Sequence, residues 1–305
     1  MTGKPGDECY KVTPVVVFSP AKLNLYLAIT GRRADGFHDL VSVAVPLEFG
    51  DTLRVELRGD GGFSLECNDA AVPCDESNLI LKASQLFKTA GGEINGARFV
   101  LEKRIPMGAG LGGGSSNGVA ALLALNRLTS RPLPPEVLRA LAVKLGSDCA
   151  LFLHRDPVVM RGRGEQVELL ATDAALRLKG RRVLVFKPGF GIATAWAYAR
   201  MAAGAPATYL PSIEAESRLS DWIAGEFPAE RLLFNNMEGP AFAKYLALPV
   251  LIECLRVEFG LAAAMSGSGS ACFALIREDT PVSEVIARIR GAWGEHTFIA
   301  DTKIG

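Results

Sequence analysis

A stretch of eleven residues rich in glycine and serine has the clearest chemical potential in this 305-residue sequence. It runs from Pro106 to Ser116 and holds five glycines and two serines. A strand-like run at 98–103 precedes it, and an apolar, helix-like run at 119–125 follows. Glycine lets the backbone approach a ligand closely, and the free N–H groups at a helix start carry partial positive charge. These features predict an anion site, and phosphate is the anion that such loops commonly hold.

Two familiar phosphate motifs do not match this loop. A Walker loop ends in Gly-Lys-Ser/Thr, whereas Gly114 is followed here by Ser115. A GxGxxG string can be read from Gly108 to Gly113, but no convincing βα unit precedes it and no acidic residue follows at the expected distance. A flexible connection between strand and helix is the alternative interpretation, and the paired serines at the helix start favour phosphate binding.

Polar side chains alternate with leucines in the segment 22–27. In a strand, Lys22, Asn24 and Tyr26 would share one face and the leucines the other. A lysine among apolar neighbours is commonly a snorkelling side chain at a sheet edge, but it could also be a buried cation aimed at a phosphate. Asp148 leads into an apolar run. It could be a helix N-cap or a carboxylate that accepts a hydroxyl proton during phosphoryl transfer.

Two further segments allow both a structural and a functional interpretation. Phe37-His38 follows a glycine turn, where such a pair is usually structural but could also stack on a base and hydrogen-bond its edge. The segment Met265–Ser270 is a second glycine loop between two expected strands. It could be a tight hairpin turn or a second loop that contacts phosphate.

The pattern of apolar residues predicts a mixture of strands and helices without regular βαβ alternation, and therefore an α+β fold. The expected strands are 15–19, 22–27, 40–47, 53–57, 63–66, 98–103, 157–160, 166–170, 182–186, 261–265, 271–276 and 297–300. The expected helices are 78–90, 115–128, 135–145, 194–202, 214–225, 237–258 with a break at Pro249, and 282–293. The polar segment Thr172–Lys179 is the predicted boundary between an N-terminal domain, 1–172, and a C-terminal domain, 173–305.

Composition excludes several classes of partner. The sequence carries 33 basic and 33 acidic residues without a basic block, so nucleic-acid binding is not indicated. The six cysteines form no CxxC pair, which predicts reduced thiols in a cytoplasmic protein. Residues 1–11 lack the apolar core of a secretory signal, and no apolar run is long enough to cross a membrane. We therefore expect a small-molecule ligand.

Four separated segments together resemble the GHMP kinases. They are Ser19–Leu25 (SPAKLNL), Arg33–His38 (RADGFH), the glycine loop with the preceding Lys103-Arg104-Ile105, and Gly146-Ser147-Asp148. The loop Ser266–Ser270 matches the C-terminal glycine motif of that family, and the resemblance covers roughly residues 18 to 300.

The resemblance implies an ATP-dependent small-molecule kinase of two domains. The N-terminal domain would resemble ribosomal protein S5 domain 2, the C-terminal domain would be ferredoxin-like, and the active site would lie in the cleft between them. The SPAKLNL and RADGFH segments further imply phosphorylation of the tertiary 2-hydroxyl of a cytidine-diphosphate derivative of methylerythritol, in non-mevalonate isoprenoid synthesis. The alternatives are a GHMP kinase for another alcohol and a catalytically silent nucleotide-binding relative.

The resemblance also implies roles for individual residues. Lys22 and Asp148 would pair as the catalytic groups, and Asn24 would help to hold the acceptor. Phe37 and His38 would recognise the cytosine, with Tyr198 rather than Trp196 as the second stacking ring. The ATP site would comprise Lys103, Pro106, Met107, Gly108, Ala109, Gly110, Leu111, Gly112, Gly113, Gly114, Ser115 and Ser116.

The family pattern leaves the metal ligands and the assembly open. Mg²⁺ would accompany ATP, with Ser116 as a candidate ligand, and the protein would be a monomer or a homodimer. The family usually has tyrosine where Phe37 stands and Val-Pro where Cys149-Ala150 stands.

Overall fold

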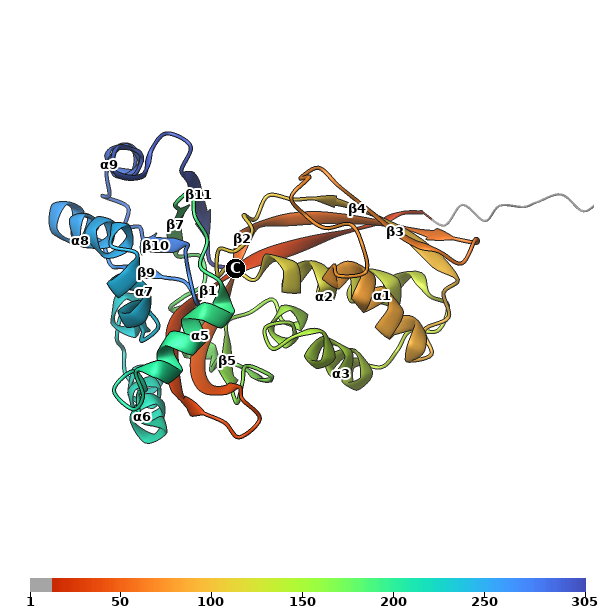
Figure 1. Ribbon diagram of the computed structural model, residues 1–305, viewed down its shortest axis with the longest axis horizontal. Coiled ribbons are helices and arrows are strands. Elements are labelled where there is room, and N and C mark those ends of the chain that lie inside the picture. Colours follow the sequence, from red (N-terminus) through yellow and green to blue (C-terminus); the bar gives the residue numbers. More distant parts are fainter. Residues whose placement is uncertain (1–12) are drawn as a thin grey trace, which may run out of the picture.

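The computed structural model describes residues 13–305, and these residues form two lobes (Figure 1). Segment 1–11, where the sequence predicts no secretory signal, lies outside the described residues. Within 13–305 no helix has the length and apolar character needed to cross a bilayer. The five cysteines in this range are unpaired.

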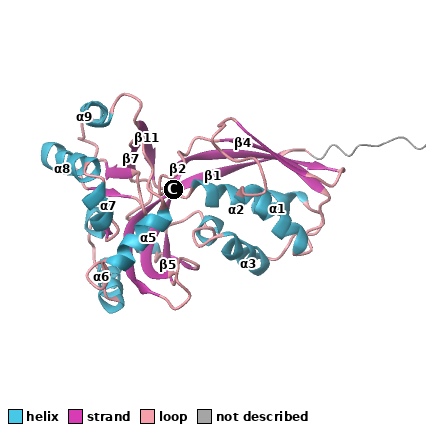
Figure 2. Ribbon diagram, in the orientation of Figure 1, coloured by secondary structure: helices cyan, strands magenta, loops and turns pink. Residues whose placement is uncertain are grey.

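The first lobe is a seven-stranded sheet with helices along one face (Figures 1 and 2). Its strands run in the order β3-β4-β2-β1-β8, while β5 pairs with β2 and β6 with β5. The strands are β1 (Val15–Arg32), β2 (His38–Arg58), β3 (Phe63–Cys67), β4 (Gly96–Glu102), β5 (Val158–Arg161), β6 (Gln166–Leu169) and β8 (Phe234–Asn235). The helices are α1 (Leu79–Thr89), α2 (Gly113–Leu128) and α3 (Pro135–Leu145), followed by the 3₁₀ turn η1 (Ala150–Leu153).

The second lobe is a four-stranded antiparallel sheet in the order β11-β7-β10-β9. Its strands are β7 (Arg182–Lys187), β9 (Ala263–Met265), β10 (Cys272–Leu275) and β11 (Phe298–Lys303). The helices are α4 (Thr172–Leu176), α5 (Thr194–Ala203), α6 (Ser212–Ala224), α7 (Glu238–Lys244), α8 (Ala247–Phe259) and α9 (Val282–Trp293), with a 3₁₀ turn η2 (Ala229–Leu232). In chain order this is a β-α-β-β-α-β arrangement with spatial order 4-1-3-2, which confirms the ferredoxin-like prediction.

The two lobes do not correspond to two separate, continuous parts of the chain. The change from the first sheet to the second falls between Leu169 and Arg182, and the predicted domain boundary at 172/173 lies in that interval. The interval holds the short helix α4, within the polar segment Thr172–Lys179. Strand β8 returns from the second half of the chain and pairs with β1. The division into 1–172 and 173–305 therefore stays a prediction.

Strands β1 and β2 are longer than the sequence pattern suggests, because each joins two predicted strands. The two strands are antiparallel, and their register shifts at three places. At one of these, Asn24 lies opposite Ala44 and Tyr26 opposite Val43, so β1 carries an extra residue, as in a β-bulge. The predicted shared face of Lys22, Asn24 and Tyr26 is therefore wrong for Tyr26. This side chain is buried in the same apolar cluster as Leu23.

The predicted helix 237–258 is two helices, and the break lies at Tyr245–Leu246 rather than at Pro249. Pro249 is the third residue of α8. In the first turn of a helix the backbone nitrogen has no acceptor inside the helix, so proline is tolerated there.

Apolar side chains of β1 and β2 join the lobes. Leu23 and Val43 share a buried cluster with Val185 of β7 and Phe273 of β10. Through this shared core, β1 and β2 hold the second sheet against the first.

A buried carboxylate fixes the start of the glycine loop. Asp51 on β2 is fully buried and accepts hydrogen bonds from the backbone N–H groups of Arg104 and Ile105, at 2.7 and 2.8 Å. The amide of Asn117 on α2 donates to it at 2.8 Å, and the ammonium of Lys103 also pairs with it. One charge thereby ties β2, the loop and α2 together.

We expect Asp51→Asn to lower the free energy of unfolding by about 3–5 kcal/mol, because it leaves the buried Lys103 ammonium without its counter-charge. Urea unfolding measures this change. Asp60→Asn is the matched control, because Asp60 is exposed and its ion pair is with exposed Arg58. Equal unfolding energies for the two variants would contradict the role given to Asp51.

Candidate active site

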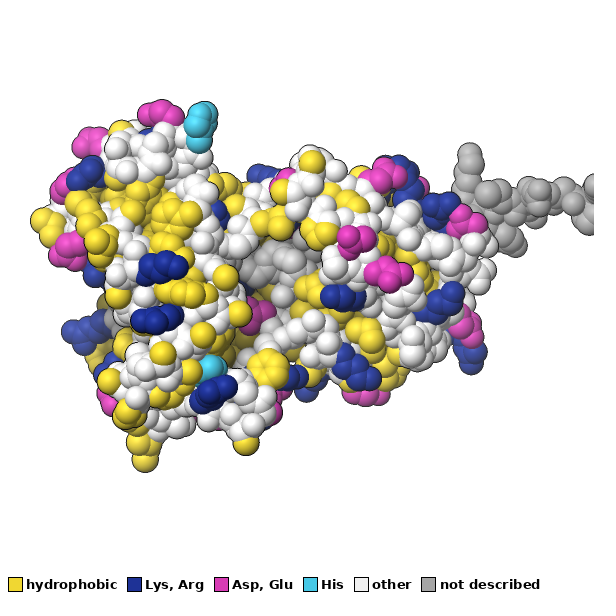
Figure 3. Space-filling model, viewed as in Figure 1, with side chains coloured by type: hydrophobic (Ala, Val, Ile, Leu, Met, Phe, Trp, Pro, Cys, Tyr) yellow, Lys and Arg dark blue, Asp and Glu magenta, His cyan; other side chains and the backbone are white. Residues whose placement is uncertain are grey.

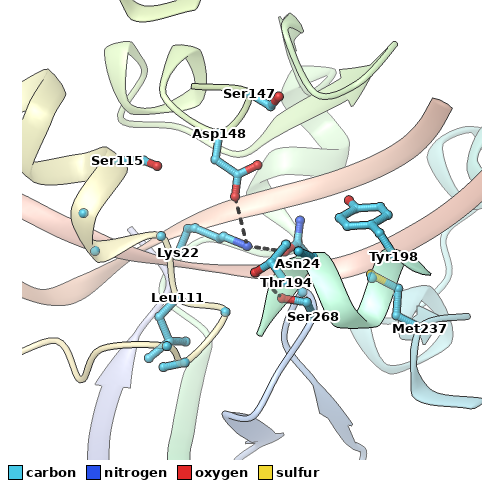
Figure 4. A pocket seen from close by; sticks show the side chains of 18 of the residues that line it. Lys22, Asn24, Leu111, Ser115, Ser147, Asp148, Thr194, Tyr198, Met237 and Ser268 are labelled. Carbon is cyan, nitrogen blue, oxygen red and sulfur yellow. Dashed lines mark hydrogen bonds and ion pairs between the residues drawn. The ribbon is translucent and has the colours of Figure 1, made fainter. Parts of the chain in front are cut away.

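A cavity of about 1110 Å³ lies between the lobes. Figure 3 shows the molecule hollowed there, and Figure 4 shows side chains from both halves of the chain around it. Its wall includes the glycine loop, β1, the start of β2, one side of α5 and the loop between β9 and β10. The cavity thus brings together the segments that the sequence singled out separately.

The glycine loop has the backbone form of an anion cradle. Gly108, Gly110 and Gly112 have φ of +59°, +75° and +71°, so every second residue lies in the left-handed region. Such alternation turns successive N–H groups toward one point, and α2 begins directly after it. All residues from Pro106 to Ser115 line the cavity. The predicted phosphate loop therefore faces the cavity along its length.

The two glycine loops are in direct contact. The hydroxyl of Ser266 donates to the Gly110 carbonyl at 3.2 Å, and the N–H of Ala271 donates to the Ala109 carbonyl at 3.0 Å. On the other side, the N–H of Lys22 donates to the Leu111 carbonyl at 3.0 Å. The first loop is thus clamped by β1 and by the second loop. Gly267 and Ser268 of the second loop also line the cavity.

Lys22 is a buried cation at the cavity wall, with 4 % of its side chain exposed. Its ammonium donates to the side-chain oxygen of Asn24 and lies 3.7 Å from a carboxylate oxygen of Asp148 (Figure 4). Burial lowers its pKa below the ordinary 10.5, and the negative charge of Asp148 opposes that shift. The ammonium is therefore short of negative charge, and a phosphate group in the cavity would supply it.

The carboxylate of Asp148 is accessible to a molecule bound in the cavity. Its side chain is 43 % exposed and lines the cavity. The 3₁₀ turn that follows has Cys149 as its capping residue, without a side-chain hydrogen bond. The alternative of a helix N-cap is therefore not what Asp148 forms. Cys149 is buried, which raises its pKa to about 11, so its thiol stays neutral beside the carboxylate.

Asn24 is held by a short chain of hydrogen bonds. Its amide donates to the hydroxyl of Ser42 at 2.9 Å, which in turn donates to the Tyr26 carbonyl at 2.6 Å. The orientation of the amide thus places its oxygen toward Lys22. The bulge in β1 makes this geometry possible, since it frees Tyr26 to point to the opposite core.

Aromatic side chains form the other end of the cavity. His38 and Tyr198 line it with ring centroids 4.9 Å apart, and Phe37 stands exposed at its edge beneath the Arg163 guanidinium at 4.8 Å. Burial and the charge of Asp148 raise the pKa of Tyr198. Trp196 does not line the cavity. It packs edge-on against Tyr245, at 5.5 Å between centroids, so Tyr198 is the better placed of the two candidates.

Two predicted nucleotide-site residues have other partners. Lys103 lines the cavity, but its ammonium is paired with Asp51. Ser116 is buried outside the cavity lining, and its hydroxyl accepts a hydrogen bond from Ser19 at 2.7 Å. Its side chain therefore belongs to the network under the loop, and its position gives no support to a role as metal ligand.

Sequence reasoning missed several residues of the site. Asp51 and Asn117 lie beneath the loop, and Thr194 and Ser268 bond to each other at 3.0 Å on the cavity wall. Ser268 lies in the second glycine loop, which the sequence singled out only as a segment, and the other three stand in no motif with a distinctive spacing. Arg163 also lines the cavity, and no motif in the sequence marks it.

Residues 13–305 contain no cluster of three or more His, Cys, Asp or Glu side chains that could hold a metal ion. Phosphoryl-transfer sites commonly hold Mg²⁺ with one or two protein groups and the substrate phosphates. The hydroxyl of Ser115 and the open side of the Asp148 carboxylate both face the cavity and fit such a site.

The fold and the site define a kinase of the GHMP class. A family model described as GHMP kinases N terminal domain matches residues 78–155, and one described as GHMP kinases C terminal matches residues 226–295. The first match contains the glycine loop and Asp148, and the second contains the second glycine loop.

Relatives and solved structures narrow this assignment. A 4-diphosphocytidyl-2-C-methyl-D-erythritol kinase of Methylacidiphilum infernorum is 38 % identical over 87 % of both chains, and one of Paraburkholderia xenovorans is 37 % identical over 90 % of both. A crystal structure of 4-(cytidine 5'-diphospho)-2C-methyl-D-erythritol kinase superposes with a TM-score of 0.75 at 34 % identity, covering 95 % of this chain and 100 % of that one. The chain belongs to the GHMP kinase family, in the branch whose members carry this kinase name.

We expect Gly110→Ala to weaken ATP binding by about tenfold or more, since a Cβ at this left-handed position is strained and would lie 2.3 Å from the Ser266 carbonyl. Isothermal titration with a non-hydrolysable ATP analogue measures the loss. Gly239→Ala, in α7 with open space around it, is the control and should bind like the wild type. Unchanged affinity in Gly110→Ala would show that contact between the two loops does not shape the nucleotide site.

Proposed function

We propose that this chain transfers the γ-phosphoryl group of ATP to the 2-hydroxyl of 4-diphosphocytidyl-2-C-methyl-D-erythritol. The observation that carries the proposal is that one cavity contains a phosphate-binding loop, a buried lysine–aspartate pair and an aromatic end. The names of the relatives supply the identity of the acceptor. This reaction belongs to isoprenoid precursor synthesis by the non-mevalonate route.

The nucleotide phosphates would lie along the backbone from Gly108 to Ser115, with the γ-phosphoryl group toward Lys22. The acceptor's cytosine would lie among Phe37, His38 and Tyr198, which places the methylerythritol part toward Asn24 and Asp148. Figure 4 supports this orientation, because Ser115 and Tyr198 lie on opposite sides of the Lys22–Asp148 pair.

Asp148 would orient the acceptor hydroxyl and take its proton as the phosphoryl group arrives. Lys22 would keep Asp148 ionised and offset negative charge on the transferring group. In a loose transition state the attacking oxygen needs little prior deprotonation, so positioning contributes much of the rate. The ion pair serves both purposes, because it fixes the carboxylate in place and keeps it charged.

Mg²⁺ would enter with ATP and be held by the nucleotide phosphates, the Ser115 hydroxyl and the open side of the Asp148 carboxylate. When bound, it neutralises phosphate charge that the loop N–H groups alone cannot offset.

A kinase for another alcohol, or a silent nucleotide-binding relative, remains the competing proposal from the sequence. A silent relative would be expected to have Lys22 or Asp148 displaced from the acceptor site. Both side chains line the cavity within 3.7 Å of each other, which supports an active enzyme.

We expect ATP-dependent turnover of 4-diphosphocytidyl-2-C-methyl-D-erythritol and no comparable turnover of homoserine or mevalonate. Neither of these alcohols has a nucleobase that could bind among Phe37, His38 and Tyr198. A coupled assay of ADP release compares the three acceptors. Absence of turnover with the cytidine compound, in protein that binds ATP, would refute the proposed acceptor.

Asp148→Asn should lower kcat by about 10²–10⁴-fold, because the amide cannot accept the hydroxyl proton. ATP affinity should stay within about threefold, since the phosphate loop is untouched. Steady-state kinetics and nucleotide titration separate the two effects. Asp173→Asn, an exposed change in α4, is the control. Near wild-type kcat in Asp148→Asn would show that this carboxylate does not act on the acceptor.

The value of kcat/KM should fall as alkaline pH removes the proton from Lys22, and the midpoint should lie below 10.5. The sign follows from the pKa: burial favours the neutral amine, so the proton leaves at a lower pH than from an exposed lysine. A pH–rate profile with a buffer-independent alkaline limb checks this. A profile that stays flat up to pH 10.5 would contradict a required ammonium.

A further inference from the structure

His38 lies between two tyrosines that come from the second half of the chain. Its ring centroid is 4.9 Å from that of Tyr198 and 5.8 Å from that of Tyr209. The Nε2 atom of His38 and the Tyr209 hydroxyl are hydrogen-bonded at 3.1 Å. Tyr198 and His38 line the cavity, whereas Tyr209 is not part of its lining. Tyr209 thus engages one ring nitrogen of His38 from behind the cavity wall.

The backbone around Tyr209 is fixed to β1. The N–H of Leu210 donates to the Ile29 carbonyl at 3.1 Å, and the amide of Asn236 donates to the carbonyls of Thr208 and Ile29 at 3.0 and 2.8 Å. His38 pairs in register with Arg32 beside the turn of the β1–β2 hairpin, three residues along β1 from Ile29. The backbone segments that carry Tyr209 and His38 are therefore both hydrogen-bonded to β1. These bonds fix the position of the phenol relative to the imidazole.

The surroundings of His38 favour the neutral form of its imidazole. Its side chain is buried, and this burial together with the positive charge of Arg32 lowers its pKa below 6.5. A neutral imidazole has one N–H donor and one acceptor nitrogen, so the bond at Nε2 decides the role of Nδ1. Within the part of the chain that the structure describes, no group is hydrogen-bonded to Nδ1.

We infer that Tyr209 accepts the Nε2–H of His38 and so makes Nδ1 a hydrogen-bond acceptor, which selects cytosine over uracil in the acceptor substrate. The inference rests on the proposed function and deepens it. Cytosine presents an exocyclic amine donor where uracil presents a carbonyl acceptor. As an acceptor, Nδ1 of His38 would receive a hydrogen bond from the cytosine amine. With uracil, the lone pair of Nδ1 would face a lone pair of the carbonyl oxygen, which is repulsive. Tyr209 is thus a positioning residue, which acts on the base through His38.

The test compares the wild type with Tyr209→Phe, which removes one oxygen and keeps the ring. Cytidine and uridine 5′-monophosphates are the probes, and isothermal titration measures their binding. The wild type should prefer the cytidine nucleotide, and Tyr209→Phe should reduce that preference about tenfold, since His38 can then move its proton to Nδ1. In turnover assays the variant should raise KM with little change in kcat.

Tyr245→Phe is the matched control. Tyr245 stacks on Phe190 at 5.2 Å between centroids and lies outside the cavity lining. Its variant should keep the wild-type preference. A general loss of packing, by contrast, would weaken both nucleotides equally in Tyr209→Phe and leave their ratio unchanged.

A second measurement needs no variant of Tyr209. The sequence has three histidines, so ¹⁵N resonances of the imidazole nitrogens can be assigned with single substitutions of His154 and His296. The wild type should carry its His38 proton on Nε2. A proton on Nδ1, or a cytidine-to-uridine ratio that changes less than twofold in Tyr209→Phe, would overturn the inference even if the wild type phosphorylates the proposed acceptor. Wild-type protein that binds ATP but neither phosphorylates that acceptor nor binds cytidine nucleotide would instead refute the proposed function.

Discussion

The buried ammonium of Lys22 is the constraint on which the site depends. A cation removed from water is costly unless opposite charge and hydrogen-bond acceptors surround it. The protein supplies one amide oxygen from Asn24 and one carboxylate at 3.7 Å, and the pKa of Lys22 is still lowered. Lys22 lines the cavity, so a negatively charged group bound there could compensate the rest of its charge. In the proposed function, a bound phosphate group would supply that negative charge beside Lys22.

Glycine at particular positions lets this cation sit where it does. A Cβ at Gly112 would approach the Lys22 side chain to 3.0 Å, and one at Gly267 would lie 3.2 Å from its ammonium. The lysine is thus packed between the two glycine loops, one from each half of the chain. A Walker loop carries its own lysine, whereas this loop receives its cation from β1. The second lobe must therefore close against the first before the site exists, which the shared core of β1, β2 and the second sheet ensures.

Much of this arrangement was predictable from local patterns, and the rest depended on contacts between distant segments. The glycine loop, the start of α2 and the α+β mixture have signatures in composition and periodicity, whereas the ferredoxin-like order was implied by the resemblance to a family. The resemblance to a family brought Lys22 and Asp148 together. Alternation failed at Tyr26, because a bulge depends on the partner strand and leaves no mark in its own sequence. Asp51 was missed for a similar reason, since its four donors come from the segment after β4 and from α2, both distant from it in sequence.

The same logic explains why Ser116 and Lys103 differ from expectation. Residues that immediately flank an anion loop can either face the ligand or hold the loop in shape. A loop whose glycines lack side chains cannot stabilise itself through packing, so polar groups beneath it must fix its backbone. Ser116 bonds to Ser19, Asn117 bonds to Ser19 and Asp51, and Lys103 balances the Asp51 charge. Preorganisation of the loop N–H groups therefore rests on a buried polar network, and the cation that we propose to meet the phosphate is Lys22 of the neighbouring strand β1.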